Sequence, residues 1–230
     1  MKILAVETSA KAGSVALSQD GKLLAESYQN TGLTHSQTLL QMAEDLLKSC
    51  GLTPRDVDAV AVAAGPGSFT GVRIGVAAAK GYAWGGQLPC YGVSTLEAMA
   101  YTAGRDGYVL PVMDARRAQV YTALFSGTQR VWEDQAISLQ ELGEKLKALD
   151  APVYLIGDGS VLCYNTLKVV VPGLSLAPEH LQHQRASGVA LAAEQAVSQG
   201  ETGDAAALKP NYLRLSQAER ERLEREKREA

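Results

Sequence analysis

The chain has 230 residues, of which 46% are hydrophobic and 20% are charged, and its formal net charge is −3. These proportions are typical of a globular chain with a buried core and unlike those of a disordered one. The acidic balance argues against unaided RNA binding, because proteins that bind RNA alone usually carry a basic surface. The odd number and wide spacing of the cysteines, Cys50, Cys90 and Cys163, argue against a disulfide framework and a zinc site.

The N-terminal apolar run stops at Glu7, which is too short for a signal sequence. No apolar run approaches the ~18 residues that a helix needs to span a bilayer. We therefore expect a cytoplasmic protein without membrane association.

The first third of the chain predicts three antiparallel strands, a helix and a buried strand. An Asp-Gly pair at 20–21 is a hairpin signal between the second and third strands. The helix begins with a capping box formed by Thr34 and Gln37. The evenly apolar strand over 59–64 leads into a Gly-Pro-Gly turn, and a second helix begins at about Thr70.

The second half repeats this order of elements. Apolar or alternating patterns predict strands over 108–113, 119–125 and 130–136, a helix over 138–149 and a buried strand over 153–156. A Gly-Asp-Gly turn follows, as a Gly-Pro-Gly turn does in the first half. A repeat that covers so many elements in the same order indicates a duplicated fold.

We therefore predict an α/β fold of two ribonuclease-H-like subdomains that face each other over a cleft. The N-terminal subdomain is expected over 1–103 and the C-terminal subdomain over 104–214, with a further long helix over 184–199. Residues 215–230 form a highly charged tail with almost no apolar stripe, which favours a solvated helix or a frayed end.

The first strand of each half ends in an acid, and the fourth strand of each half ends in a glycine turn. Glycine turns at helix N-termini bring backbone N–H groups to phosphate, and a strand-end acid can hold magnesium or its water. The alternative is that these glycines only make tight turns. The predicted nucleotide cleft consists of Glu7, Thr8, Ser9, Asp114, Gly157, Asp158 and Gly159.

Stronger signals for catalysis are missing from the sequence. It contains neither a G-x-x-x-x-G-K-[ST] phosphate loop nor a G-x-S-x-G nucleophile elbow. The only histidines, His35, His180 and His183, include no pair four residues apart that would place two imidazoles on one helical face. We therefore predict no catalytic residue and no metal ligand.

The helix from Thr70 to Trp84 carries small residues at intervals of four, Gly71, Gly75 and Ala79. A glycine inside a helix costs about 1 kcal/mol relative to alanine, so a close approach by another element should offset the cost. We predict that this helix and the preceding one form a docking surface for a partner. Packing within the same chain is an equally open alternative. The predicted interface consists of Ser36, Leu39, Leu40, Ala43, Leu47, Gly71, Arg73, Ile74, Gly75, Ala78, Ala79 and Tyr82.

Four segments, ILAVETSAKAGSVAL, GPGSFTGVRIGVAAAKG, PVMDARRAQVYTALF and KPNYLR, resemble the TsaB (YeaZ) family over essentially residues 1–214. The resemblance implies the superfold of actin-like ATPases, sugar kinases and heat-shock proteins. It also implies kinship with TsaD, which transfers a threonylcarbamoyl group to the adenosine beside the tRNA anticodon. TsaD-like proteins carry a histidine pair four residues apart that helps to hold a metal, and this chain has no such pair.

The resemblance therefore implies a non-catalytic scaffold that pairs with a TsaD-like enzyme and is joined by a TsaE-like P-loop ATPase. It implies that tRNA is reached only through the complex, and it leaves a homodimer of the isolated chain open. We expect no required cofactor, with ATP or ADP binding in the cleft left open. One competing hypothesis is an actin-like ATPase or small-molecule kinase that uses Glu7, Asp114 and the turn over 157–159. Another is a direct tRNA-binding module.

Overall fold

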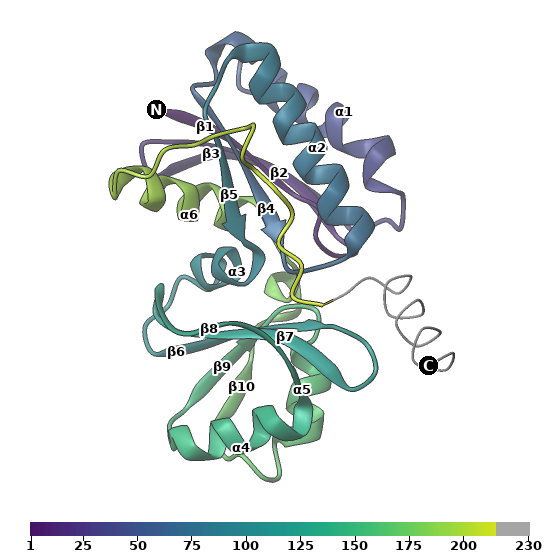
Figure 1. The fold of residues 1–230 in the computed structure, drawn as a ribbon, viewed down its shortest axis with the longest axis vertical. Coiled ribbons are helices and arrows are strands. Elements are labelled where there is room, and N and C mark those ends of the chain that lie inside the picture. Colours follow the sequence, from purple (N-terminus) through teal and green to yellow (C-terminus); the bar gives the residue numbers. More distant parts are fainter. Residues whose placement is uncertain (215–230) are drawn as a thin grey trace, which may run out of the picture.

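The computed structural model describes residues 1–214, so the predicted charged tail over 215–230 lies outside the described residues. The chain forms two stacked subdomains, each built on a five-stranded mixed sheet (Figure 1). This arrangement confirms the predicted duplicated α/β fold. No helix among residues 1–214 combines the length and the apolar character needed to cross a membrane.

The first sheet has the strand order β3-β2-β1-β4-β5. The first three strands form an antiparallel meander, and β4 and β5 continue from β1 in parallel. Asp20 and Gly21 both have positive φ angles, which fits the tight turn predicted between β2 and β3. The bounds are β1 (Lys2–Glu7), β2 (Gly13–Gln19), β3 (Lys22–Gln29), β4 (Ala59–Gly65) and β5 (Cys90–Ser94).

Helices cover both faces of the first sheet. Helices α1 (His35–Ser49) and α2 (Phe69–Gly86) pack on one face, against the valines and leucines of β1, β2 and β4. Helices α3 (Thr95–Ala103) and α6 (Ala186–Ser198) pack on the other face, where most of the inward-facing strand residues are alanines. Sheet residues this small allow the two helices to come close to the strands.

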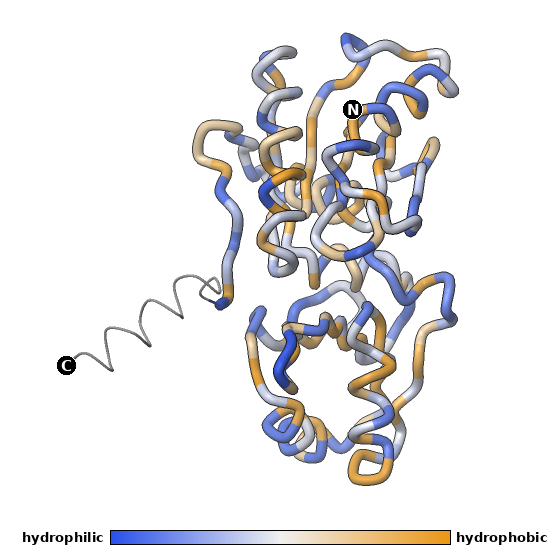
Figure 2. Tube along the Cα trace, turned by 90° about the vertical axis from the view of Figure 1, so that its right-hand side faces the viewer, coloured by the Kyte–Doolittle hydropathy of each residue, from blue (hydrophilic) through white to orange (hydrophobic). Residues whose placement is uncertain are grey.

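The position of α6 corrects the predicted subdomain boundary. The sequence assigned residues 104–214 to the C-terminal subdomain, yet α6 contacts β1, β2 and α3 of the first subdomain. The segment after α6 then runs back along α2 toward the junction of the subdomains (yellow in Figure 1; the part of the chain that leads to the grey trace in Figure 2). Lys80 of α2 donates hydrogen bonds to the carbonyls of Ala206 and Leu208 in this segment. The first subdomain is therefore discontinuous in sequence.

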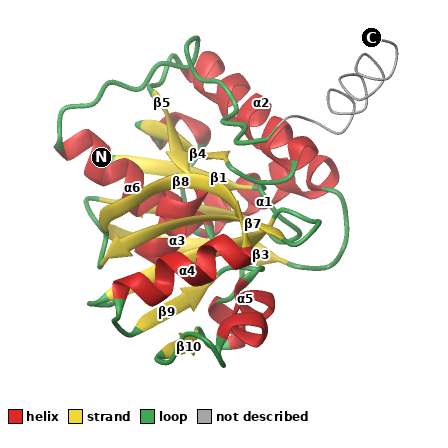
Figure 3. Cartoon of the chain, turned by 60° about the horizontal axis from the view of Figure 1, so that its bottom comes forward, coloured by secondary structure: helices red, strands yellow, loops and turns green. Residues whose placement is uncertain are grey.

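The second sheet repeats the topology, with the order β10-β9-β6-β7-β8. Helices α4 and α5 cover its outer face, and α3 packs against the face that turns toward the first subdomain (Figure 3). Within residues 1–214, 3₁₀ turns at Pro54–Asp56 and Glu179–Leu181 complete the described fold. The remaining bounds are β6 (Tyr108–Asp114), β7 (Gln119–Ser126), β8 (Gln129–Ser138), α4 (Leu139–Leu149), β9 (Val153–Ile156), α5 (Ser160–Leu167) and β10 (Leu174–Leu176).

The starts of α2, α3 and α4 follow the side-chain chemistry of capping, whereas α1, α5 and α6 have no side-chain cap. Ser68, Ser94 and Ser138 each accept a hydrogen bond from a backbone N–H in the first turn of α2, α3 and α4. The capping box predicted for Thr34 is wrong, because the Thr34 side chain accepts no such bond. Its hydroxyl lies 3.3 Å from the hydroxyl of Ser36 instead.

Candidate functional site

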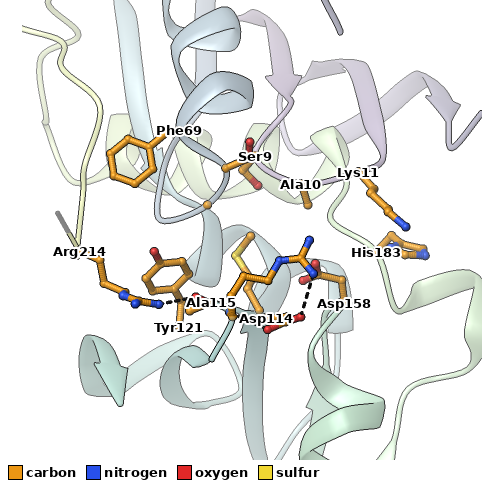
Figure 4. Close-up of a pocket in the computed structure, with 14 residues that line it drawn as sticks. Ser9, Ala10, Lys11, Phe69, Asp114, Ala115, Tyr121, Asp158, His183 and Arg214 are labelled. Carbon is orange, nitrogen blue, oxygen red and sulfur yellow. Dashed lines mark hydrogen bonds and ion pairs between the residues drawn. The ribbon is translucent and has the colours of Figure 1, made fainter. Parts of the chain in front are cut away.

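A cavity of about 590 Å³ lies where the two subdomains face each other. Its upper wall comes from the loop after β1 and the N-terminus of α2, and its lower wall from the ends of β6 and β9 (Figure 4). The carboxyl ends of strands in an open α/β sheet are the usual location of ligand sites. The lining residues are Ser9, Ala10, Lys11, Gly67, Ser68, Phe69, Met113, Asp114, Ala115, Arg116, Tyr121, Asp158, His183 and Arg214.

The structure brings together only some of the residues predicted for this cleft. Ser9, Asp114 and Asp158 line the cavity, whereas Glu7 and Thr8 are fully buried beneath it. The Thr8 hydroxyl donates a 2.8 Å hydrogen bond to the carbonyl of Gly71. Thr8 therefore fastens the first turn of α2 to the end of β1 and does not reach the cavity.

Glu7 is a buried acid with an incomplete set of partners. One carboxylate oxygen accepts a hydrogen bond from the Ser9 backbone N–H, and the other, Oε2, has no partner among the described residues. Burial is the main cause that raises the pKa of Glu7 from 4.5 to about 7, and the hydrogen bonds from Ser9 oppose that rise. The nearby Asp158 carboxylate raises it further. Glu7 is thus buried beneath the cavity and does not line it, which corrects the prediction that it belongs to the nucleotide cleft.

The glycines after β9 serve backbone packing. A side chain at Gly157 would overlap the carbonyl oxygen of Val112, and a Cβ at Gly159 would lie 2.8 Å from the backbone nitrogen of Asp114. The Gly159 N–H donates to the Val112 carbonyl at 3.0 Å. These glycines let the turn lie directly on β6, and neither of them lines the cavity. This close packing is consistent with the alternative left open by the sequence, in which these glycines only make tight turns.

The lower wall of the cavity carries two acids that are already engaged. Asp114 accepts a 2.7 Å hydrogen bond from the backbone N–H of Arg116, whose guanidinium lies 3.7 Å away from the same carboxylate. Asp158 accepts a 3.0 Å hydrogen bond from the side chain of Gln184. Desolvation raises the pKa of Asp158, while the bond from Gln184 and the charge of His183 oppose the rise.

No local sequence pattern predicted that several of the lining residues belong to this cavity. Lys11, Phe69, His183 and Arg214 come from four distant parts of the chain, and only the folded topology brings them together. The Arg214 guanidinium donates to the carbonyl of Ala115, across the junction of the subdomains. The KPNYLR segment that ends in Arg214 carried the family resemblance, but no spacing rule connects it to the cleft.

Half of the predicted docking residues, three on α2 and three on α1, are buried in the chain's own core and cannot be reached by a partner. A side chain at Gly71 would overlap the Thr8 carbonyl, and one at Gly75 would overlap the Thr8 hydroxyl. Ala79 is 1% exposed and packs in the core under α1 and α2. The stripe of small residues therefore approaches the chain's own sheet, which is the intrachain alternative left open above. Leu39, Ala43 and Leu47 of α1 are buried in the same core.

The remaining predicted docking residues lie at or near the surface. Leu40 is 67% exposed, and Ser36 is also exposed. Arg73 is exposed, but its Nε donates a 2.7 Å hydrogen bond to the Tyr212 hydroxyl, and Tyr212 stacks on Phe69. Ile74, Ala78 and Tyr82 are half-buried against the core.

Among residues 1–214, no group of three or more His, Cys, Asp and Glu side chains is placed to hold a metal ion. His35 has a structural contact instead, because its Nε2 lies 2.8 Å from the carbonyl oxygen of Ala10. The neighbouring Gly13 leaves room for this ring, since an added Cβ there would lie 2.8 Å from His35 Nδ1. His35 therefore holds the loop that follows β1.

Comparison with known proteins identifies the family. The model for TsaD, tRNA N6-adenosine threonylcarbamoyltransferase, matches residues 28–222. A Bacillus subtilis protein named tRNA threonylcarbamoyladenosine biosynthesis protein TsaB is 35% identical over 99% of this chain and 100% of its own length. The chain belongs to the TsaB (YeaZ) family.

Solved structures agree with this assignment. YeaZ from Pseudomonas aeruginosa is 30% identical, with a TM-score of 0.78 over 92% of this chain and 99% of its own. Component A of (R)-2-hydroxyglutaryl-CoA dehydratase from Acidaminococcus fermentans is 13% identical, with a TM-score of 0.53 over 86% of this chain and 99% of its own. The second likeness shows the fold alone.

Proposed function

We propose that this TsaB-family chain takes part in the biosynthesis of threonylcarbamoyladenosine on tRNA, as a non-catalytic partner of a TsaD-like enzyme. The full-length similarity to the Bacillus subtilis TsaB protein, whose name states that pathway, carries the first part of this proposal. The match to the TsaD family model supports kinship with the enzyme that would be the partner. A TsaE-like P-loop ATPase completes the proposed complex, and tRNA is reached through it.

The burial of Glu7 supports the non-catalytic part. Phosphoryl transfer in an actin-like cleft needs an ionised acid that faces a metal ion and its water. Here the Glu7 side chain is 0% exposed, and its nearest hydrogen-bond donor is the Ser9 backbone. Because its raised pKa leaves a large fraction protonated near neutral pH, the group suits a sealed core better than a metal site.

The exposed outer face of α1 is the part of the predicted docking surface that a partner can reach. Leu33, just before α1, is 58% exposed, and Leu40 on α1 is 67% exposed. A protein partner that covers these two leucines would remove their apolar surface from water, which stabilises association. We therefore place the partner contact on Leu33, Ser36 and Leu40, with Ile74 and Ala78 of α2 beside them, and not on the buried stripe of Gly71, Gly75 and Ala79.

The test is threonylcarbamoyl transfer to tRNA by TsaD-like and TsaE-like proteins, with and without this chain. We expect modification to require the chain, and we expect the chain alone to hydrolyse no ATP. Modification that proceeds equally well without it would refute the proposed role. Turnover of ATP by the isolated chain, abolished by Asp114→Ala, would establish the ATPase alternative instead.

A matched pair of variants tests the contact surface. Leu40→Glu places a charge on the exposed face of α1, and Val169→Glu does the same on the second subdomain, where Val169 is 85% exposed. Surface changes of this kind usually alter stability by less than about 0.5 kcal/mol. We expect Leu40→Glu to abolish binding of the TsaD-like protein and Val169→Glu to leave it intact. Equal binding by both folded variants would remove α1 from the interface.

A further inference from the structure

The edge strand β5 of the first sheet turns backbone groups away from its neighbour. Within residues 1–214, β4 is the only strand that pairs with β5. The Val60 N–H of β4 donates to the Pro89 carbonyl at 3.0 Å, so every second residue from Pro89 onward faces β4. The residues between them, Cys90 and Gly92, therefore direct their N–H and C=O groups outward. A strand edge of this kind is a template for pairing with another extended segment.

A cavity of about 420 Å³ opens on this edge. The segment that follows α6 forms its outer wall and crosses β5 at Cys90, because a Cβ at Gly203 would lie 2.7 Å from the Cys90 nitrogen. The same segment then covers one face of the strand, where a Cβ at Gly92 would lie 2.5 Å from Leu208 Cδ1. Farther on, the Asn211 N–H donates to a carbonyl of β4 at 2.6 Å. The wall is thus fastened at several points, while Gly92 stays exposed and lines the cavity.

The two sides of this cavity differ in chemistry. On the side of α2, Leu208 packs against the apolar core that includes Cys90. On the side of α6 lies Glu201, whose N–H donates to the Ala196 carbonyl at the end of that helix at 3.0 Å. Successive side chains of an extended segment point to opposite faces. A segment added beside β5 would therefore direct its side chains alternately toward Leu208 and toward Glu201.

The side of α6 is acidic. Glu201 and Asp204 line the cavity with a single lysine, Lys209. The Glu201 side chain is exposed, and its carboxylate makes no hydrogen bond or ion pair with another residue of the described range 1–214. Burial is the main cause that raises the pKa of Glu97 on α3, and the negative charge of Glu201 adds to this rise, whereas Arg130 opposes it. Glu201 is thus an unpaired carboxylate near another acid, and a cationic side chain can pair with it.

We propose that this cavity binds an extended segment of a partner protein in which basic and apolar residues alternate. The segment adds to β5 as a further strand and exchanges hydrogen bonds with the backbone of Gly92. It directs an apolar side chain toward Leu208 and a lysine or arginine toward Glu201. Main-chain hydrogen bonds supply the affinity in this mode of recognition, and contacts to alternate side chains supply the specificity. The site is independent of the proposed pairing surface, because α1 packs against β2 and β3 at the other edge of the sheet.

The experiment is a titration of the full chain with the peptide Lys-Val-Lys-Val-Lys, acetylated and amidated at its ends, followed by NMR spectra. We expect saturable shifts at the amides of Gly92 and Leu208. Two control peptides separate the backbone from the charge. Lys-Val-Lys-Val-Lys with every backbone nitrogen methylated cannot donate main-chain hydrogen bonds, and Glu-Val-Glu-Val-Glu reverses the charge. Each should bind about tenfold more weakly or worse.

A matched pair of variants tests the acidic side of the cavity. Glu201→Lys should weaken binding of the lysine peptide by about fivefold and remove its advantage over the acidic peptide. Glu141→Lys makes the same change of charge on the exposed surface of α4, outside the cavity, and should alter the affinity by less than about twofold. Both positions are exposed, so both variants should unfold at the same urea concentration as the unaltered chain.

Three results would overturn the proposal. The first is the absence of saturable shifts at Gly92. The second is equal affinity for the methylated and unmethylated peptides, because binding would then not use the edge of β5. The third is equal weakening by Glu201→Lys and Glu141→Lys, because attraction would then come from the charge of the whole chain.

Discussion

The buried Glu7 gives the sharpest prediction, a loss of stability as pH rises. The pKa of Glu7 is raised from 4.5 to about 7 in the fold, so folding disfavours the ionised carboxylate. The cost is absent below the unfolded pKa, grows through the interval from 4.5 to 7, and is complete above it. Since one pKa unit corresponds to 1.36 kcal/mol, the difference of 2.5 units amounts to about 3 kcal/mol.

Glu7→Gln removes the titrating group and keeps its size. We expect the stability of the variant relative to the unaltered chain to increase by about 3 kcal/mol between pH 4.5 and pH 8, as measured by urea unfolding at both values. Any fixed cost of the new amide is the same at both pH values and cancels in this comparison. Glu141→Gln, on the exposed surface of α4, controls for the chemical change itself. A relative stability of Glu7→Gln that does not change with pH would refute the argument.

Two further predictions concern the glycines of α2 and the cysteines. Gly75→Ala should lower the free energy of unfolding by roughly 1–3 kcal/mol, because its Cβ would overlap the Thr8 hydroxyl and lie 3.3 Å from Val62 Cγ2. A Cβ at Gly81 in the same helix would meet no atom within 4 Å, so Gly81→Ala should raise the free energy of unfolding by up to about 1 kcal/mol. Urea unfolding of the two variants therefore separates the effect of packing from that of helix propensity. Burial raises the pKa of Cys90 to about 11 and that of Cys163 to about 12. Both thiols should therefore resist alkylation at pH 8 until the chain unfolds. The half-buried Cys50 should react first. Mass spectrometry of alkylated peptides checks this order, and early labelling of Cys163 would contradict it.

The fold was predictable because its signals are local and occur twice. The turn at Asp20-Gly21, the evenly apolar β4 and the alternation in β7 are each readable from a few neighbouring residues. Because the same elements occur in the same order in both halves, the fold could be predicted although the ends of single elements could not. The elements that were missed, β5, α3, α5 and β10, are short or lie next to stronger signals. For these elements the tertiary context decides the conformation, and local propensity does not.

The location of α6 could not be read from the sequence, because its helical pattern fits packing on either sheet. What decides the choice is the row of alanines on one face of the first sheet, including Ala5, Ala16 and Ala61, which accepts the small residues of α6. Pairing of two small surfaces leaves little empty space, whereas the second sheet presents larger side chains such as Leu110 and Leu124 to its helices. A complementarity between segments so far apart in the sequence has no signature in a local window.

The candidate site shows the same limit in a different form. Because β1 and β6 each end in an acid, the sequence predicts that both acids face the cleft. In the structure only Asp114, at the end of β6, lies on the cavity wall, and Glu7 is buried. Gly67 and Gly71 allow the start of α2 to lie directly on Ser9 and Thr8, and this contact closes the end of β1 over Glu7. Asp114 at the end of β6 stays on the cavity wall. Gly71, one of the glycines that suggested a docking helix, is therefore part of the close contact between α2 and the end of β1 that lies over Glu7. The difference between a buried acid and an open one thus depends on a contact between a helix and a strand end, which no local sequence pattern shows.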